Sequence, residues 1–397
     1  MPRPPAPYHP VTPAVARELR AIVGAGHVIY CDPVAMQDYA HDEVADEAFA
    51  HMPEAVVKPD TPEEISEILR LANRHLVPVT PRGAGSGLSA GATPVHGGIV
   101  LSLERMNRIL EIDRENMVVV VEPGVVTNDV NHAVEQYGLF YAGYPMSLEM
   151  CSVGGNVAEN AGGGRAIKYG VTGRYVLGLE VVLPTGEIVQ LGGKRVKDVT
   201  GYNLIQLLVG SEGTLGVFSK ITLRLLPRPG ARAVLLAPFP DAATAIGAVP
   251  RVMTRGRILP TSVEFMDHRS IQVAYDYTGE RLPHPDVGAM LLIEVDGTSE
   301  EHVSRDMDSI AELCLELGAL DVLVGRTPPE ERRMWRPRQE MAEALKAISP
   351  VQSLEDIVVP MAQIPDLIPE LNRLSEKYDV LIPCYGHAGD GNHTPRW

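Results

Sequence analysis

A glycine-rich stretch at residues 80–94, TPRGAGSGLSAGATP, constrains the fold more than any other part of the sequence. It has the G-x-G-x-x-A spacing of a dinucleotide fingerprint at Gly85, Gly87 and Ala90, and a carboxylate, Glu104, follows downstream. A Rossmann loop must open a helix whose N-terminus faces the diphosphate. The residues that follow, LSAGATPVHGG, hold too much glycine and proline for that helix. A Walker loop is excluded too, because no G-K-[ST] ends the run.

Two interpretations of this stretch remain open. Gly83, Gly85 and Gly87 allow positive φ angles, so successive backbone N–H groups can form a nest that binds a phosphate without a helix. Arg82 would add a positive charge at the edge of such a nest. The alternative is an ordinary glycine-rich hairpin loop, and this segment alone favours neither.

Two more glycine clusters bear on that choice, at residues 151–170 (CSVGGNVAENAGGGRAIKYG) and 210–216 (GSEGTLG). The first predicts a loop over 154–164, in which the amides of Asn156 and Asn160 suit a polar ring or a ribose. Three loops that need close backbone approach predict a long cofactor threaded through one domain. The alternative is a glycine-rich β domain with tight turns.

Hydrophobic periodicity and turn residues predict the elements around these loops. A helix over 61–76 is well defined, with Thr61 as its N-cap, Pro62 in its first turn and Glu64 completing a capping box. After PRPG at 227–230, glycine becomes rarer and strands alternate with helices. We therefore expect an α+β chain with a lead-in (1–50), a first domain (51–230) and a second domain (231–397) that contains a helix-covered antiparallel or mixed sheet.

Composition excludes several function classes. A formal charge of −16 over 397 residues argues against a nucleic-acid partner. The four cysteines are far apart and form no C-x-x-C, which indicates a reducing interior and neither a disulfide framework nor a zinc knuckle. The proline-rich start is no signal peptide, and no apolar run would cross a bilayer. We expect a cytoplasmic protein, attached to a membrane only through partners.

Several motifs in order resemble one flavoprotein family. PRGAGSGLSAGA, CSVGGNVAENAGG with KYG, and GSEGTLGV with LRLLP are similar to the FAD domain of vanillyl-alcohol-oxidase-type proteins. PTSVEFMD, LLIEVDG, MWRPRQE, EDIVVP and YGHAGDGN resemble the cap domain of the branch that holds the large flavin subunit of glycolate oxidase and D-lactate dehydrogenases. The resemblance spans about residues 20–392. It implies an α+β fold: a two-subdomain PCMH-type FAD-binding domain, then a truncated ferredoxin-like cap.

The resemblance also implies FAD as cofactor, with its diphosphate on residues 82–89 and its adenosine near Glu212 and Gly213. The implied activity is oxidation of a small D-2-hydroxy acid to the 2-oxo acid, with hydride passing to flavin N5 and electrons leaving to an acceptor. Iron–sulfur or second flavin subunits are the implied partners. The residues expected to line the cofactor are Arg82, Gly83, Ala84, Gly85, Ser86, Gly87, Leu88, Ser89, Pro145, Ser152, Val153, Gly154, Gly155, Asn160, Gly162, Glu212 and Gly213.

The implied chemistry needs a cation for the carboxylate and a base for the hydroxyl proton. Arg338 occupies the family's W-x-x-R position and suits the first task, although other arginines nearby make a solvated helical arginine the alternative. His387, where a strand runs into a glycine loop, suits the second, or it binds a divalent metal such as zinc. Asn392 completes the candidate catalytic set, and it and Asp390 shape the turn or orient the histidine.

The sequence departs from the family motif G-H-x-G-D-G-N-x-H. His393 follows Asn392 directly, a one-residue slip that would turn its side chain to the opposite face of an extended segment. The sequence stops at Trp397, before the family's Glu-His segment. Two hypotheses follow: an active 2-hydroxy-acid dehydrogenase, or a catalytically impaired FAD-binding fragment or non-catalytic subunit. An alkylglycerone-phosphate-synthase type is a third. QSLEDIVVP lacks the lysine of the hydroxyglutarate branch, which favours glycolate or D-lactate.

Overall fold

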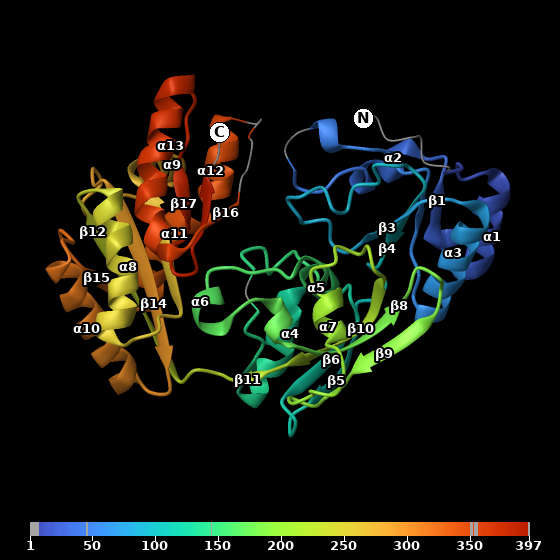
Figure 1. Cartoon of the computed structure of the whole chain (residues 1–397), viewed down its shortest axis with the longest axis horizontal. Coiled ribbons are helices and arrows are strands. Elements are labelled where there is room, and N and C mark those ends of the chain that lie inside the picture. Colours follow the sequence, from blue (N-terminus) through green and yellow to red (C-terminus); the bar gives the residue numbers. More distant parts are fainter. Residues whose placement is uncertain (1–7, 45–46, 144, 350–351, 353–355, 396–397) are drawn as a thin grey trace. The chain divides into compact units, whose positions relative to one another are not determined.

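The computed structural model describes residues 8–44, 47–143, 145–349, 352 and 356–395. It divides into two compact units, drawn in Figure 1. The first unit comprises residues 1–162 and 171–228, and the second comprises 163–170 and 229–397. The short segment 163–170 thus belongs to the second unit although the first unit surrounds it in the sequence, and nothing in the sequence indicates this exchange.

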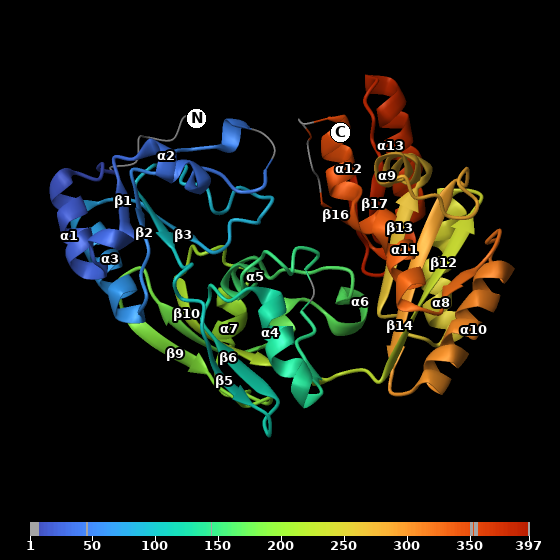
Figure 2. The ribbon, with the colours of Figure 1, turned by 180° about the vertical axis from the view of Figure 1, so that it is seen from behind.

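The first unit begins with a four-stranded sheet in the order β1-β2-β4-β3. Both β2 and β3 run parallel to β4, whereas β1 is antiparallel to β2. Helices α1 and α3 cover this sheet (Figure 2), because their apolar stripes, including Leu19, Ile65 and Ile68, are fully buried in one core with Ile99. The bounds are β1 Val28–Tyr30, β2 Ala55–Val57, β3 Val79–Arg82, β4 Ile99–Ser102, α1 Pro13–Val23, α2 Pro33–Met36 and α3 Pro62–His75.

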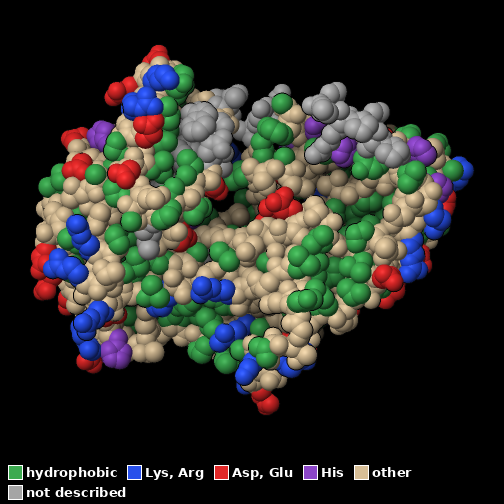
Figure 3. All heavy atoms as spheres, in the orientation of Figure 1, with side chains coloured by type: hydrophobic (Ala, Val, Ile, Leu, Met, Phe, Trp, Pro, Cys, Tyr) green, Lys and Arg blue, Asp and Glu red, His purple; other side chains and the backbone are tan. Residues whose placement is uncertain are grey.

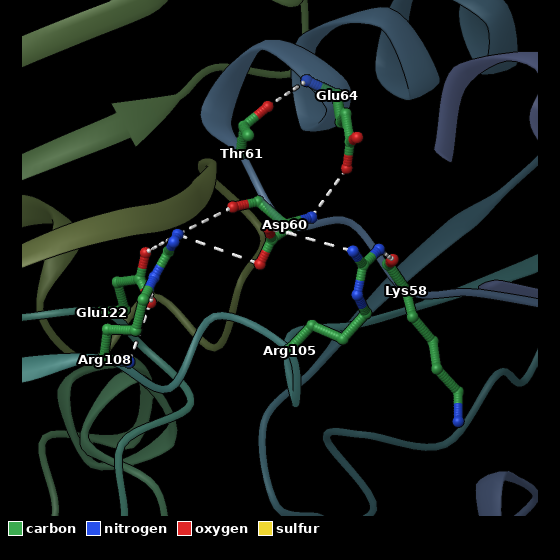
Figure 4. Close-up of polar contacts among 7 residues, drawn as sticks. All are labelled: Lys58, Asp60, Thr61, Glu64, Arg105, Arg108 and Glu122. Carbon is green, nitrogen blue, oxygen red and sulfur yellow. Dashed lines mark hydrogen bonds and ion pairs between the residues drawn. The ribbon is translucent and has the colours of Figure 1, made fainter. Parts of the chain in front are cut away.

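The start of α3 matches the sequence prediction in part. Thr61 is the N-cap, and its hydroxyl accepts a hydrogen bond from Glu64 N at 3.2 Å. The carboxylate of Glu64 accepts from Asp60 N at 2.7 Å, so the reciprocal bond of a capping box reaches one residue further back than predicted (Figure 4). The prediction that this helix starts at a capped Thr61 is confirmed.

The second sheet of this unit has five antiparallel strands in the order β5-β6-β10-β8-β9. Arg108, next to β5, binds Glu122 through Nε at 3.0 Å and Nη2 at 2.7 Å, and its Nη2 lies 3.9 Å from Asp60 Oδ1 (Figure 4). Asp60 precedes α3, so these charges join the two sheets. The bounds are β5 Ile109–Asp113, β6 Val118–Val121, β7 Leu139–Phe140, β8 Val176–Val182, β9 Ile188–Gly192, β10 Val217–Arg224, β11 Leu226–Pro227, α4 Thr127–Val134, α5 Val153–Glu159 and α7 Leu204–Leu208.

The second unit is built on a seven-stranded sheet in the order β15-β12-β14-β13-β17-β18-β16, and all neighbouring strands among the described residues are antiparallel. This confirms the expected α+β architecture. The strand bounds are β12 Ala231–Phe239, β13 Ser262–Asp267, β14 Ala289–Gly297, β15 Leu323–Gly325, β16 Ile357–Val358, β17 Cys384–His387 and β18 Asn392–Pro395. The helix bounds are α6 Ala166–Tyr169, α8 Ala242–Gly256, α9 His268–Thr278, α10 Glu300–Glu316, α11 Pro328–Gln339, α12 Met341–Ile348 and α13 Ile364–Tyr378.

Helices cover both faces of this sheet (Figures 1 and 2). In β14, Leu291 and Ile293 pack with α8, α10 and α13, whereas Met290 and Leu292 pack with α9, α11 and α12. Successive side chains of a strand point to opposite faces, so a wholly apolar strand needs cover on both sides. A carboxylate in such a strand is therefore shielded from water and needs a hydrogen-bond donor or a cation within the protein.

Two further features concern charge on the surface and the length of the helices. Basic and acidic side chains are interspersed on the face that Figure 3 draws. None of the helices in the described residues combines the length and the apolar character that crossing a bilayer requires.

Candidate functional site

Within the first unit, hydrogen bonds join the three glycine-rich stretches at residues 80–94, 151–162 and 210–216. The hydroxyl of Ser152 accepts hydrogen bonds from Ala84 N at 3.2 Å and from Gly155 N at 3.4 Å, which ties the first segment to the second. The third segment joins them, because Glu212 N donates to Ala158 O at 2.9 Å. Residues from segments that are more than a hundred positions apart in the sequence thus lie together in the fold.

The segment after β3 is a loop. Residues 83–98, all of which the structure describes, form turns and bends and then enter β4, so the rejection of a Rossmann helix is confirmed. The downstream carboxylate of the false fingerprint, Glu104, is bound by Lys58 at 2.7 Å, by the Tyr39 hydroxyl at 2.9 Å and by the Ser102 hydroxyl at 2.8 Å. These partners make Glu104 part of the scaffold of the first sheet.

Several backbone N–H groups of this loop are not used in hydrogen bonds within the protein. Among the described residues, the N–H groups of residues 85–89 donate to no other protein atom, whereas Ala84 N is taken by Ser152. Gly85 has φ +71°, a conformation that glycine adopts without strain. Successive unpaired N–H groups on a glycine-rich turn are the elements of an anion-binding nest.

Arg82 does not lie at the edge of this nest as expected. Its side chain is buried, and it donates to the backbone oxygens of His41 at 2.7 Å and Asp38 at 2.9 Å. A Cβ on Gly85 would collide with its guanidinium. Burial outweighs the nearby carboxylates and lowers the pKa of Arg82 from its ordinary value. Arg82 therefore supports the loop from beneath.

The second segment differs from the predicted loop over 154–164, because its first half is helix α5. Ser152 is the N-cap and Asn160 ends the helix in the left-handed region. Asn156 is buried and donates to the Thr127 hydroxyl at 2.6 Å, and the Asn160 side chain accepts from Gly173 N at 2.9 Å. Both amides thus stabilise the local fold, and a short tight helix was missed because two of its residues are glycine.

The remaining predicted cofactor residues belong to the same unit. Val153 and Pro145 are buried, Gly162 is exposed, and Glu212 and Gly213 turn the chain with φ +52° and +71°. Ser86, Gly87, Leu88 and Ser89 continue the nest, with Leu88 half exposed at 49%. The roles of all these residues at a cofactor stay predictions.

A buried acceptor beside the nest lacks a donor. The side chain of Asp42 is only 4% exposed, and its Oδ2 atom has no hydrogen-bond partner among the described residues. This oxygen lies 3.8 Å from the place where a Cβ of Gly87 would be. An unpaired buried acceptor costs about 1–3 kcal/mol, so a hydroxyl-bearing ligand at the loop would relieve that cost.

The second unit brings together two of the predicted catalytic residues. Arg338, in α11, and His387, at the end of β17, both bind the carboxylate of Glu264 in β13. Arg338 Nε lies 2.8 Å from Oε2, and His387 Nδ1 lies 2.6 Å from Oε1. Arg338 is 6% exposed, so the alternative of a solvated helical arginine is wrong.

These three charges control one another. Burial works to raise the pKa of Glu264, but the charges of His387 and Arg338 outweigh it and hold that pKa below its ordinary value. Burial works to lower the pKa of His387, but the charge and hydrogen bond of Glu264 outweigh it and raise that pKa. The two shifts agree in describing an ionised carboxylate that stabilises a cation on either side.

Asn392 faces His387 across the β17–β18 hairpin, where the two residues pair, and His393 pairs with Gly386. Asp390 shapes the turn between these strands, because its Oδ1 accepts from Asn392 N at 3.1 Å. The segment after the turn is extended, so His393 is one step out of register with His387, although its side chain lies outside the described residues.

Zinc remains a prediction. Within the part of the chain that the structure describes, His, Cys, Asp and Glu side chains form no group of three that could hold a metal ion. His387 binds Glu264 there, and its role as a metal ligand gains no support from its surroundings.

Glu264 is the residue that sequence reasoning missed. A signal existed: it interrupts the apolar run SVEFM, in a strand whose residues are all buried. A buried carboxylate without a cation is prohibitively costly, so its position predicts a partner. The sequence near Glu264 does not show which residues are its partners, because Arg338 and His387 are 74 and 123 residues away.

Family models match both halves of the chain. A model described as "FAD binding domain" matches residues 53–192, and one described as "FAD linked oxidases, C-terminal domain" matches residues 228–397. The chain is 42% identical to glycolate oxidase subunit GlcD of Bacillus subtilis, over 90% of this chain and 75% of the relative. The chain belongs to the FAD-linked oxidase family. This makes it an FAD-dependent oxidoreductase.

Other comparisons agree with this FAD-linked oxidase assignment. The D-lactate dehydrogenase of Anaerostipes hadrus is 38% identical over 97% of this chain and 81% of the relative. Alkyldihydroxyacetonephosphate synthase matches the fold with a TM-score of 0.80 at 18% identity, covering 97% of this chain and 74% of that one. p-Cresol methylhydroxylase matches with a TM-score of 0.76 at 20% identity, covering 96% and 81%. The PCMH-type fold expected from the sequence is confirmed.

The first unit of this oxidase fits FAD on the evidence of its own residues. The unpaired N–H groups of residues 85–89 suit a diphosphate, and the unpaired Asp42 oxygen suits a hydroxyl of the cofactor. The glycines let the two segments approach, because a Cβ on Gly83 would collide with the Ser152 hydroxyl. We expect these residues to hold the cofactor.

Proposed function

We propose that this FAD-linked oxidase oxidises a small D-2-hydroxy acid, such as glycolate or D-lactate, to the corresponding 2-oxo acid. The arrangement of Arg338 and His387 on the single buried carboxylate of Glu264 supports this proposal most strongly. It combines a fixed cation with a hydrogen-bonded imidazole, which are the two groups that a 2-hydroxy acid requires. The names of the relatives, glycolate oxidase subunit and D-lactate dehydrogenase, point to the same substrate class.

Each side chain has one task in this proposal. The guanidinium of Arg338 uses Nε for Glu264 and has further N–H groups, which bind the substrate carboxylate as a planar fork. His387 takes the proton of the hydroxyl group, and Glu264 stabilises the imidazolium that forms. Bound FAD would supply the acceptor for the hydride of the α-carbon. Proton and hydride together account for the two-electron oxidation of the alcohol to the ketone or aldehyde.

The electrons must leave the protein for the next turnover. Because the relatives from Bacillus subtilis and Escherichia coli are named as subunits, we propose that an electron-transfer subunit, with an iron–sulfur cluster or a second flavin, receives them. Co-expression with the genes next to this one, followed by size-exclusion chromatography, tests whether a complex forms.

The decisive experiment is anaerobic reduction of the bound flavin. The purified chain is loaded with FAD, and its visible absorption is followed after addition of glycolate, D-lactate or, as a control, L-lactate. Bleaching by glycolate or D-lactate and a much slower response to L-lactate are expected. A chain that binds FAD but bleaches with none of these acids would support the alternative of a catalytically impaired FAD-binding protein.

A further inference from the structure

We propose that Glu264 is a positioning residue that fixes His387 in its Nδ1–H tautomer, so that Nε2 is the atom that meets the substrate. The same carboxylate holds the guanidinium of Arg338 in a fixed orientation. The consequence for catalysis rests on the proposed function, whereas the tautomer itself is a property of the second unit and does not depend on any substrate.

The hydrogen bonds define the tautomer. Oε1 of Glu264 is 2.6 Å from His387 Nδ1, and Oε2 is 2.8 Å from Arg338 Nε. The Glu264 side chain has no exposed surface, so water does not compete for these oxygens. An ionised carboxylate can only accept, and Nδ1 must therefore carry the hydrogen. In the neutral ring Nε2 is then the unprotonated nitrogen and the only one that can accept a proton.

Three elements make this geometry rigid. Glu264 and His387 are paired residues of the neighbouring antiparallel strands β13 and β17, and such pairs lie close on one face of a sheet. Tyr385, two residues before His387 on β17, lies under the guanidinium of Arg338, with 5.0 Å from its ring centre to the Arg338 Cζ atom. Strand β17 therefore carries His387 and also positions Arg338 through Tyr385.

The segment 163–170 lies against this carboxylate. A Cβ on Gly164 would be 2.7 Å from Glu264 Oε1 and 3.7 Å from His387 Cε1, so its backbone covers the bond between them. Arg165 anchors the segment to Glu294 at 3.2 Å, and Lys168 binds Asp296. The close approach needs glycine at 164, and it gives a way to disturb Glu264 without changing its chemistry.

The test is the ¹⁵N NMR spectrum of the His387 ring in the full chain, assigned by its loss in His387→Asn and followed to a pH at which the ring is neutral. We expect the Nδ1–H tautomer in the wild type. In Glu264→Gln one amide group faces two donors, and its oxygen can serve only one of them. Arg338 is always charged and keeps the oxygen, so the amide NH₂ faces His387 and should reverse the tautomer to Nε2–H.

Matched variants isolate the effect. Glu180→Gln makes the same change at a buried carboxylate of the first unit, which binds Lys220 at 3.1 Å, and should leave the His387 signals unchanged. Gly164→Ala should displace Glu264 and shift the Nδ1 proton signal upfield as the bond lengthens. Gly247→Ala in α8, where a Cβ meets nothing within 4 Å, should not shift it. The alanine pair keeps the test decisive if Glu264→Gln does not fold.

An Nε2–H tautomer in the wild type, or a Glu264→Gln protein that keeps the wild-type tautomer, would overturn the proposal. So would a Gly164→Ala protein with an unmoved Nδ1 proton. If the spectra behave as expected but no 2-hydroxy acid bleaches the flavin, the positioning role stands and the proposed function fails. In an active protein, Glu264→Gln should reduce kcat more than it raises KM, because the carboxylate acts through His387 at the proton transfer.

Discussion

Two neighbouring glycines of α5, Gly154 and Gly155, differ in how much room the protein leaves for a side chain. A Cβ on Gly154 would lie 2.5 Å from Pro123 Cβ and 2.9 Å from Pro123 O, atoms that cannot rotate away. A Cβ on Gly155 would meet only the Ser152 hydroxyl, at 3.3 Å. Both glycines are predicted to line FAD, but the contacts within the protein explain only Gly154.

The expected magnitudes follow from two opposing effects. Alanine in place of glycine inside a helix gains up to about 1 kcal/mol. Overpacking against a well-packed neighbour costs about 1–3 kcal/mol, and contact with backbone belongs at the upper end. Gly154→Ala should therefore lower the free energy of unfolding of the first unit by about 1–2 kcal/mol. Gly155→Ala should leave that free energy unchanged or raise it by up to about 1 kcal/mol.

The assay measures stability and cofactor binding separately. Urea unfolding of the apoprotein gives the first quantity, and quenching of FAD fluorescence during titration gives the second. Gly155→Ala should bind FAD at least about 10-fold more weakly, a loss of about 1.4 kcal/mol, although its apoprotein is as stable as the wild type. Wild-type FAD affinity in Gly155→Ala would refute a close approach of this residue to the cofactor, and wild-type stability in Gly154→Ala would refute the steric argument.

Three further predictions concern single side chains. Ser152→Ala removes the acceptor of Ala84 N and the cap of α5, and should cost about 1–2 kcal/mol in urea unfolding and weaken FAD binding. Arg338→Lys keeps the charge without the planar fork and should lower kcat/KM for D-lactate about 10- to 100-fold, whereas Arg336→Lys on the exposed side of α11 should not. Burial raises the pKa of Glu294 despite Arg165. Such a carboxyl favours folding only below its unfolded pKa, and that contribution is lost as pH rises through the folded pKa. Glu294→Gln should therefore raise the melting temperature more at about pH 8 than at about pH 4, and the reverse order would contradict the burial argument.

Local signals predicted the elements well and failed where neighbours far along the chain decide. The N-cap at Thr61 follows from a few adjacent residues. α5 was missed because glycine is unfavourable in a helix, and packing against Pro123 and the Ser152 cap outweighs that preference. The periodicity of the helix also predicts a buried Leu76, and this is wrong, because Leu76 ends α3 in the left-handed region and is half exposed.

The sequence by itself determined that residues 80–94 cannot open a Rossmann helix, and its motifs placed the chain among FAD-linked oxidases. The positions of its three glycine-rich segments can also be read from the sequence, although the first half of the second segment forms helix α5 and not the predicted loop. Only the tertiary structure decided that Arg82 supports the loop from beneath, that residues 163–170 belong to the second unit, and that Glu264 joins Arg338 to His387. Those results depend on groups that are far apart in the sequence and are brought together by sheet register and burial. A buried charge needs a partner, but which residue is that partner is decided only in the folded chain.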